Sequence, residues 1–144
     1  MKVALSGCFD CLHKGHKVLL KKAEVLSTYG NYRDTVTVAL NSDESVRRLK
    51  GNSRPFQNFE TRKKALENYL AKCSNFKIIG FTTEEELLNI YRNAIPFVII
   101  HGNDIKDTSK ITGIDEFNVL LIPRIKDKNN NIISTTSIIE NKFL

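Results

Sequence analysis

His13 and His16 stand three residues apart in the stretch GCFDCLHKGHKVLL, which covers residues 7–20. Gly7 follows a short apolar run, Gly15 lies between the histidines, and residues of helical spacing come next. The start of a helix offers unpaired backbone N–H groups and a partial positive charge, and both suit a phosphate. Two imidazoles at the same place would add hydrogen-bond donors for the same anion. The spacing therefore predicts a phosphate cradle, although it matches neither the G-x-G-x-x-G nor the P-loop pattern.

The same residues admit a structural and a metal-binding interpretation. A histidine near a helix start is commonly a cap or a surface residue, and a catalytic zinc normally takes a third protein ligand. The three cysteines, Cys8, Cys11 and Cys73, do not form the two matched pairs of a structural zinc site. Cys8 and Cys11 do form a C-x-x-C, which is redox-active in a thioredoxin-like context. We expect reduced thiols and no dedicated metal site, with these alternatives left open.

Strand-like and helix-like segments alternate along the chain, and this order determines where His13 and His16 lie. Apolar and β-branched runs predict strands over residues 2–6, 35–40, 76–79, 97–101 and 118–122. Helical spacing predicts helices over residues 16–27, 43–49, 59–70, 83–92 and 134–141, and Thr83 and Glu86 have the spacing of a capping box. This order favours a Rossmann-like three-layer α/β/α fold with a parallel five-stranded sheet. Residues 1–144 are expected to form one domain.

Ligands of such sheets bind beyond the carboxyl ends of the strands, where the strand order reverses. Four segments leave the predicted strands on that side, namely residues 7–15, 41–54, 101–113 and 123–133. The net charge of +6, from 22 basic and 16 acidic residues, indicates an anionic partner, either a polyphosphate or a nucleic acid. No run approaches the ~20 apolar residues of a membrane span, and no secretory signal is recognisable. We therefore expect a cytoplasmic protein that has no membrane partner.

Four blocks of sequence resemble one superfamily of enzymes. Gly-Cys-Phe-Asp-x-x-His-x-Gly-His, over residues 7–16, resembles the H-x-G-H signature of the nucleotidylyltransferases, which include the cytidylyltransferases. Asn-Ser-Asp-Glu-Ser-Val-Arg-Arg-Leu-Lys-Gly, over residues 41–51 and followed by Arg54-Pro55, resembles the ADP-heptose synthase adenylyltransferase domain. Ile-Ser-Thr-Thr-Ser-Ile-Ile, over residues 133–139, resembles the Ser-Thr-Thr-x-Ile-Ile signature of that family, and residues 101–104 stand where it has Gly-Gly-Asp. The blocks follow the family's order along nearly the whole chain.

The resemblance implies a reaction. A nucleoside triphosphate, with ATP favoured, and a sugar or alcohol phosphate of the heptose-1-phosphate type would give a nucleotide-activated product and pyrophosphate. The protein would position the acceptor phosphate and neutralise charge, as is general for phosphoryl-type transfer. Mg²⁺ is expected because a triphosphate usually carries one. Relatives of this size suggest a homodimer.

The resemblance also implies roles for individual residues. His13, His16 and Lys50 would be catalytic, and Asp10 and Lys50 would bind the acceptor substrate; Asp10 is also a possible Mg²⁺ contact. Lys50 lies in the loop region after the second strand, and its alternative interpretation is a solvated surface lysine. The alternative interpretation of Arg62 is an exposed arginine on a helix. Nucleotide binding is implied for Gly7, Cys8, Phe9, His13, His16, Arg62, Gly102, Asp104, Ser134, Thr135 and Thr136, the last three of which could equally be helix caps.

Departures from the family pattern leave the base and the acceptor open. His101 stands where the family has a lysine, and Asn103 replaces its second glycine. A glycerol-3-phosphate cytidylyltransferase-like enzyme using CTP shares three blocks and Pro123-Arg124, but its following Thr-Glu-Gly is absent. A riboflavin-phosphate adenylyltransferase is a further alternative. A basic nucleic-acid-binding module would explain the charge around residues 47–54, but no stacking or recognition-helix motif supports it, so we expect no nucleic-acid partner.

Overall fold

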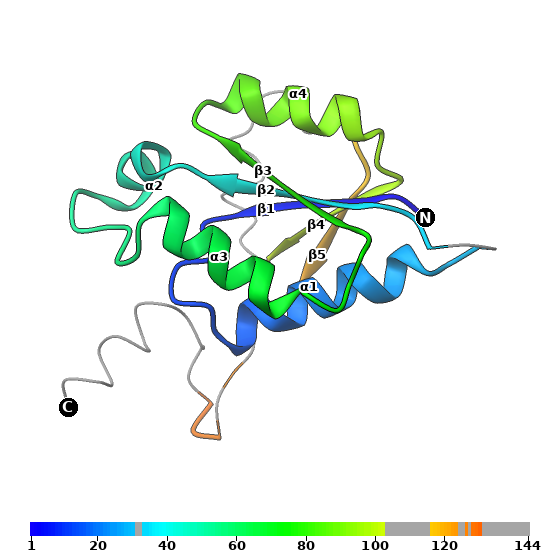
Figure 1. The fold of residues 1–144 in the computed structure, drawn as a ribbon, viewed down its shortest axis with the longest axis horizontal. Coiled ribbons are helices and arrows are strands. Elements are labelled where there is room, and N and C mark those ends of the chain that lie inside the picture. The colour runs from blue at the N-terminus through cyan, green and yellow to red at the C-terminus, as the bar shows by residue number, and fades with distance from the viewer. Residues whose placement is uncertain (31–32, 103–115, 124–125, 127, 131–144) are drawn as a thin grey trace.

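The computed structural model describes residues 1–30, 33–102, 116–123, 126 and 128–130 (Figure 1). Five strands and four helices follow one another in these parts of the chain. The strands are β1 (Val3–Gly7), β2 (Val36–Asn41), β3 (Phe76–Phe81), β4 (Val98–Gly102) and β5 (Val119–Ile122). The helices are α1 (Lys14–Ser27), α2 (Asp43–Lys50), α3 (Phe59–Tyr69) and α4 (Glu84–Ala94). Each agrees in type with its predicted segment; the helix predicted over residues 134–141 lies outside the described residues.

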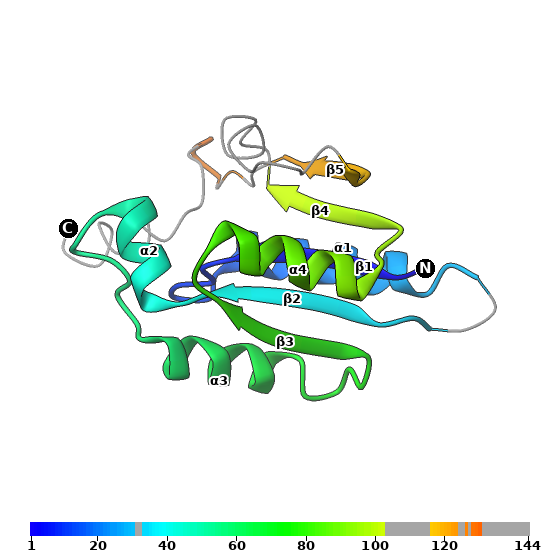
Figure 2. The ribbon, with the colours of Figure 1, turned by 90° about the horizontal axis from the view of Figure 1, so that it is seen from above.

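The strands form one parallel sheet in the order β3-β2-β1-β4-β5 (Figure 2). The chain builds outward from β1 to β3 on one side and then returns to place β4 on the other side of β1. The strand order therefore reverses between β1 and β4, and the carboxyl ends of these two strands mark the expected ligand site. The predicted Rossmann-like fold with a parallel five-stranded sheet is confirmed.

Helices cover both faces of the sheet because the central strands are buried on both sides. α1 and α3 lie on one face and α4 on the other (Figure 1). Val3 and Leu5 of β1 pack into the core beneath α1 and α3, while Ala4, between them, belongs to the core beneath α4. Full burial of each Val or Leu contributes about 1.5–3 kcal/mol, so both cores hold β1 in a fixed register.

Capping residues start the helices that leave the carboxyl edge. Ser42 accepts a hydrogen bond from Ser45 N at 3.2 Å, and Thr83 accepts one from Glu86 N at 3.1 Å. The predicted capping box at Thr83 needs a correction, because the Glu86 carboxylate accepts from Thr82 N, at 2.9 Å, instead of the cap's own N–H. The carboxylate thus ties down the turn between β3 and α4. None of the described helices has the length and apolar character needed to cross a bilayer.

Candidate active site

The loop between β1 and α1 has an unusual backbone. Phe9 and Cys11 have φ angles of 47° and 51°, in the left-handed region that non-glycine residues seldom adopt. The Phe9 ring folds back into the core, and a Cβ on Gly7 would lie 2.9 Å from its Cε2 atom. Gly7 is therefore required for the close approach of this ring. The loop brings the Phe9 ring to a centroid distance of 5.2 Å from His16.

His13 and His16 are held by the start of α1. His13 is the N-cap, and its Nδ1 accepts from Gly15 N at 3.0 Å and from His16 N at 3.4 Å. The Nδ1 of His16 accepts from His13 N at 3.2 Å, and the two rings stack with centroids 3.7 Å apart. Because both Nδ1 atoms accept, each neutral ring carries its proton on Nε2. The capping and phosphate-binding interpretations are thus compatible, since capping uses Nδ1 and leaves two Nε2–H donors.

Both rings are neutral near pH 7. Burial is the main cause that lowers the pKa of His16, to about 3, and the charges of His13 and Lys50 add to it. Burial, followed by the charge of Lys50, also lowers the pKa of His13. Neutral imidazoles can still donate Nε2–H to an anion, and a bound polyphosphate would favour their protonation. The neutral pair therefore acts through hydrogen bonds at a helix start.

The low pKa of His16 predicts a pH-dependent stability. The unfolded chain binds a proton at this ring near its ordinary pKa of 6.5, whereas the folded chain does so only near pH 3. Stability should therefore fall as the pH falls from 6.5 towards about 3, because the unfolded state takes up more protons. Urea unfolding at about pH 7 and pH 5 should show a smaller loss for His16→Ala than for the parent. An equal loss in both proteins would contradict a neutral, partly buried His16 ring.

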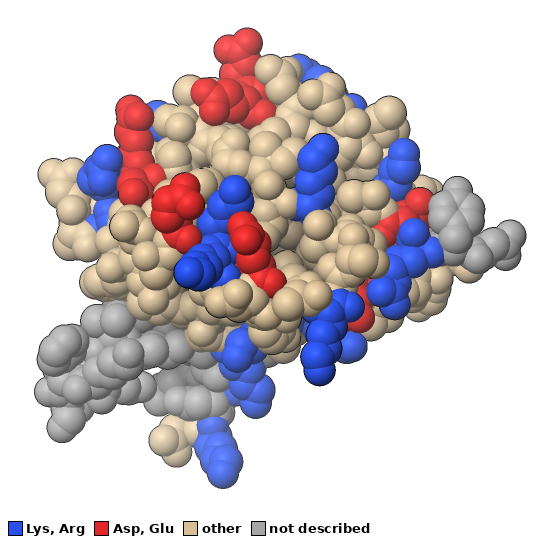
Figure 3. Space-filling view, viewed as in Figure 1, with Lys and Arg blue, Asp and Glu red and all other residues tan. Residues whose placement is uncertain are grey.

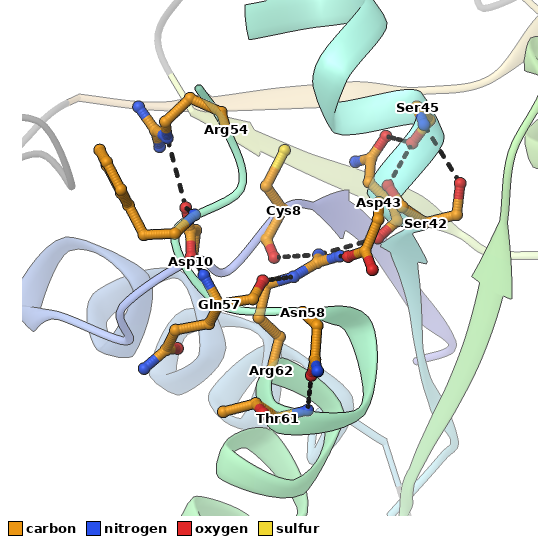
Figure 4. A network of polar contacts seen from close by, with 12 residues as sticks. Cys8, Asp10, Ser42, Asp43, Ser45, Arg54, Gln57, Asn58, Thr61 and Arg62 are labelled. Atoms are coloured by element: carbon orange, nitrogen blue, oxygen red, sulfur yellow. Dashed lines mark hydrogen bonds and ion pairs between the residues drawn. The ribbon is translucent and has the colours of Figure 1, made fainter. Parts of the chain in front are cut away.

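Asp10 and Gln57 connect this loop to the segment before α3 (Figure 4). The Asp10 carboxylate is fully buried and accepts from Phe56 N at 2.8 Å, Gln57 N at 2.9 Å and Arg54 Nε at 3.3 Å. The Oε1 atom of Gln57 accepts in return from Cys11 N at 3.2 Å. These hydrogen bonds hold Asp10 and Cys11 in place, and the loop that contains them leads into His13 at the start of α1.

Arg62 is buried and lies at the centre of the same network (Figure 4). Its Nε donates to Gln57 O at 2.9 Å, and its Nη1 donates to Cys8 O and Asn41 O, both at 2.8 Å. Its Nη2 donates to the Asp43 carboxylate at 2.7 Å. The exposed-arginine alternative is therefore wrong. Four of the five N–H donors of a guanidinium are in use, so the side chain joins the ends of β1 and β2 to α3 and has little left for a nucleotide.

A cleft of about 350 Å³ opens at the carboxyl edge of the sheet. Its wall includes the ends of β1 to β4, with Gly7, Cys8, Arg48, Lys50, Glu84 and His101 among the lining residues. Lys50 is the last residue of α2, and not part of a loop as expected from the sequence. Its positive charge lowers the pKa values of His13 and His16, which places it within electrostatic reach of both rings. The cleft and the histidine pair are therefore neighbouring parts of one site.

The cleft contains residues that sequence reasoning missed. Thr82, Glu84 and Leu87 form the wall after β3, a segment absent from the four expected ones. The predicted strand ended at residue 79, whereas β3 continues to Phe81. A parallel sheet places the carboxyl ends of all its strands at one edge, and this signal could have identified the segment.

The sulfur chemistry and the metal chemistry of the site are both limited. Cys8, Cys11 and Cys73 are free thiols, and burial is the main cause that raises the pKa of Cys8, so it is a poor nucleophile. Within the parts of the chain that the structure describes, no three His, Cys, Asp or Glu residues gather into a metal site. Asp10 does not fit as a Mg²⁺ ligand, because both carboxylate oxygens already accept hydrogen bonds. Asp104, Ser134, Thr135 and Thr136 lie outside the described residues.

A parallel sheet of this order, with a histidine pair beside its switch point, is a Rossmann-like arrangement suited to a phosphate-bearing ligand. The sequence model of the cytidylyltransferase-like family matches residues 4–141. The chain therefore belongs to the cytidylyltransferase-like family, as its H-x-G-H block indicated.

Curated relatives support the same family assignment, and a solved structure shows the same fold. The bifunctional protein HldE of Koribacter versatilis is 35% identical over 143 residues, which cover 96% of this chain and 26% of that protein. HldE of Rhodopseudomonas palustris is 37% identical over 99 residues, which cover 69% of this chain and 18% of that protein. The chain thus spans about a fifth to a quarter of these relatives. A bifunctional NMN adenylyltransferase/ADP ribose pyrophosphatase from Francisella tularensis has the same fold, with a TM-score of 0.63 and 17% identity over 90% of this chain and 39% of that one.

Proposed function

We propose that this chain transfers a nucleotidyl group from ATP to the phosphate of a sugar phosphate of the heptose-1-phosphate type, releasing pyrophosphate. The observation that carries the proposal is the pair of Nε2–H donors on His13 and His16, fixed at the start of α1 beside a cleft that Lys50 lines. The two Nε2–H donors, the start of α1 and the Lys50 ammonium group all give a positive potential near the switch point of the sheet. The matches to HldE proteins favour ATP and a sugar phosphate over other substrates of the family.

The chemistry needs positioning more than proton transfer. An oxygen of the acceptor phosphate forms a bond to the α-phosphorus, and the bond from that phosphorus to the bridging oxygen breaks. The electron pair leaves with pyrophosphate. A phosphate monoester has its second pKa near 6, so its dianion attacks without a general base at about pH 7. His13 and His16 would stabilise negative charge on the triphosphate, and Lys50 would hold the acceptor phosphate close to it.

Several further features belong to the same proposal. Mg²⁺ would arrive with the triphosphate, since no three His, Cys, Asp or Glu among the described residues gather into a site that could hold the ion. We also propose a single cytoplasmic domain that works as a homodimer. A nucleic-acid partner is not part of the proposal. On the face shown in Figure 3, Lys and Arg are interspersed with Asp and Glu and do not form one continuous basic strip.

A pyrophosphate-release screen tests the proposal. The screen crosses Mg·ATP and Mg·CTP with heptose 1-phosphate, glycerol 3-phosphate and riboflavin phosphate, using the full chain. We expect the highest kcat/KM for ATP with heptose 1-phosphate. A preference for CTP with glycerol 3-phosphate would select the cytidylyltransferase alternative. If no combination released pyrophosphate, the proposed reaction would be wrong.

Lys50→Ala should weaken the acceptor site. The ammonium group lines the cleft and its charge reaches both histidines, so its loss should lower kcat/KM for the acceptor by about tenfold to a hundredfold. Arg47→Ala is the matched control, because Arg47 lies exposed on the same helix and does not line the cleft. Steady-state kinetics with each substrate varied will separate the two variants. Equal effects of the two substitutions would mean that Lys50 is a solvated surface lysine without a role in acceptor binding.

A further inference from the structure

His101 presents a hydrogen-bond acceptor to the cleft, whereas His13 and His16 present hydrogen-bond donors. Its Nδ1 lies 2.8 Å from the carbonyl oxygen of Gly102. A carbonyl oxygen only accepts, so Nδ1 must carry the proton and donate it. In the neutral ring Nε2 then holds a lone pair and can only accept. The histidines at the start of α1 present Nε2–H donors, whereas His101, which lines the cleft, presents an acceptor.

The acceptor at His101 and the cation at Lys50 belong to different walls. Lys50 ends the helix that follows β2, and His101 lies near the end of β4. β2 and β4 pair with opposite sides of β1. Neighbouring strands lie about 4.8 Å apart, so the strand ends from which these walls rise are roughly 10 Å apart. This distance suits a small molecule that has a phosphate at one end and a few carbon atoms beyond it.

The two walls favour different chemical groups. Lys50 attracts a phosphate, and a lone pair on His101 accepts a hydrogen bond from a hydroxyl group but repels a second anion. The family that this chain resembles has a lysine where His101 stands, and a lysine can only donate and attracts anions. The histidine therefore reverses the preference of this wall. A neutral, hydroxyl-bearing group fits it and a carboxylate or second phosphate does not.

We propose that His101 determines which acceptor the enzyme uses. Its Nε2 accepts a hydrogen bond from a hydroxyl group of a phosphorylated polyol or sugar whose end away from the reacting phosphate is uncharged. Acceptors with a second anionic group at that end are rejected. This inference rests on the proposed function, because it assigns the cleft to the acceptor of that reaction.

Histidine NMR tests the hydrogen-bonding premise without turnover. The chain has three histidines, so a ¹⁵N-histidine-labelled full chain gives three rings, and the His101→Gln variant assigns one of them. We expect Nε2–H tautomers for His13 and His16 and the Nδ1–H tautomer for His101. Adding the acceptor that the pyrophosphate screen identifies should shift the His101 Nε2 resonance. An Nε2–H tautomer at His101, or a resonance that the acceptor leaves unmoved, would overturn the proposal.

Matched acceptors test the selection itself. One pair is glycerol 3-phosphate and 3-phosphoglycerate; the other is heptose 1-phosphate and its analogue with a carboxylate in place of the terminal hydroxymethyl group. The parent should prefer the hydroxyl member of the productive pair by about tenfold or more, the effect of one hydrogen bond and one repulsion. His101→Lys should reduce or reverse this preference. His101→Leu should raise the acceptor KM about tenfold and leave the nucleotide KM unchanged.

The outcomes separate the two proposals. Pyrophosphate release by the parent with an unchanged preference in His101→Lys would sink the assignment of His101 and leave the reaction standing. A raised nucleotide KM in His101→Leu would place the ring against the nucleotide, which also contradicts the assignment. If the parent released no pyrophosphate with any acceptor and either nucleotide, the reaction and the selection would fall together.

Discussion

Replacing His16 by alanine should lower kcat by about a hundredfold to a thousandfold while the protein stays folded. Its Nε2–H is a fixed donor where negative charge develops, and loss of one such donor costs about that factor in other enzymes. The ring also caps α1 by accepting from His13 N, so a small loss of stability is expected, of about 1 kcal/mol. The two effects differ in size enough to be measured separately.

The control for His16→Ala is a cap outside the site. Thr83 caps α4 by accepting from Glu86 N and does not line the cleft, so Thr83→Ala should cost similar stability without the loss of turnover. Urea unfolding and single-turnover pyrophosphate release on both variants give the comparison. Turnover that fell equally in the two variants would show that His16 acts only as a cap.

The fold could be predicted because its pattern is local. A run such as residues 35–40 is short and rich in β-branched residues, which is typical of a buried strand, and the capping residues lie next to the helices that they start. The predicted boundaries of the described elements lie within two residues of the observed ones. The first helix begins at Lys14, two residues before its predicted start, because His13 is itself the N-cap.

The chemistry at the start of α1 could be predicted from the sequence, but the contacts that hold this loop in place could not. His13 and His16 are close in sequence, so their spacing alone placed them on one helix start. The bonds that hold their loop join Cys11 to Gln57 and Cys8 to Arg62, pairs that are 46 and 54 residues apart. Such contacts depend on how α3 packs against the sheet, and no periodicity or motif encodes that. A glutamine in a loop gave no signal of its role.

Arg62→Met should be the most destabilising of the substitutions considered, by about 3 kcal/mol or more. Methionine fills similar space but leaves the carbonyl oxygens of Cys8, Asn41 and Gln57 without their donor. It also removes the cation beside Asp43. Because a domain has only about 5–15 kcal/mol of stability, this loss is a large part of the total. Arg62→Lys keeps the charge and three donors, so it should recover part of the stability.

An exposed ion pair provides the comparison for Arg62. Arg92 donates to Glu116 at 2.9 Å, and both side chains are about half exposed, so Arg92→Met should change the urea midpoint little. Arg62→Met should lower that midpoint strongly, and a nucleotide that binds the folded state should restore part of it. The comparison also decides what Arg62 does. If Arg62→Met were as stable as Arg92→Met yet lost affinity for the nucleotide, the guanidinium would contact the substrate directly, and the network of carbonyl bonds would not be its main task.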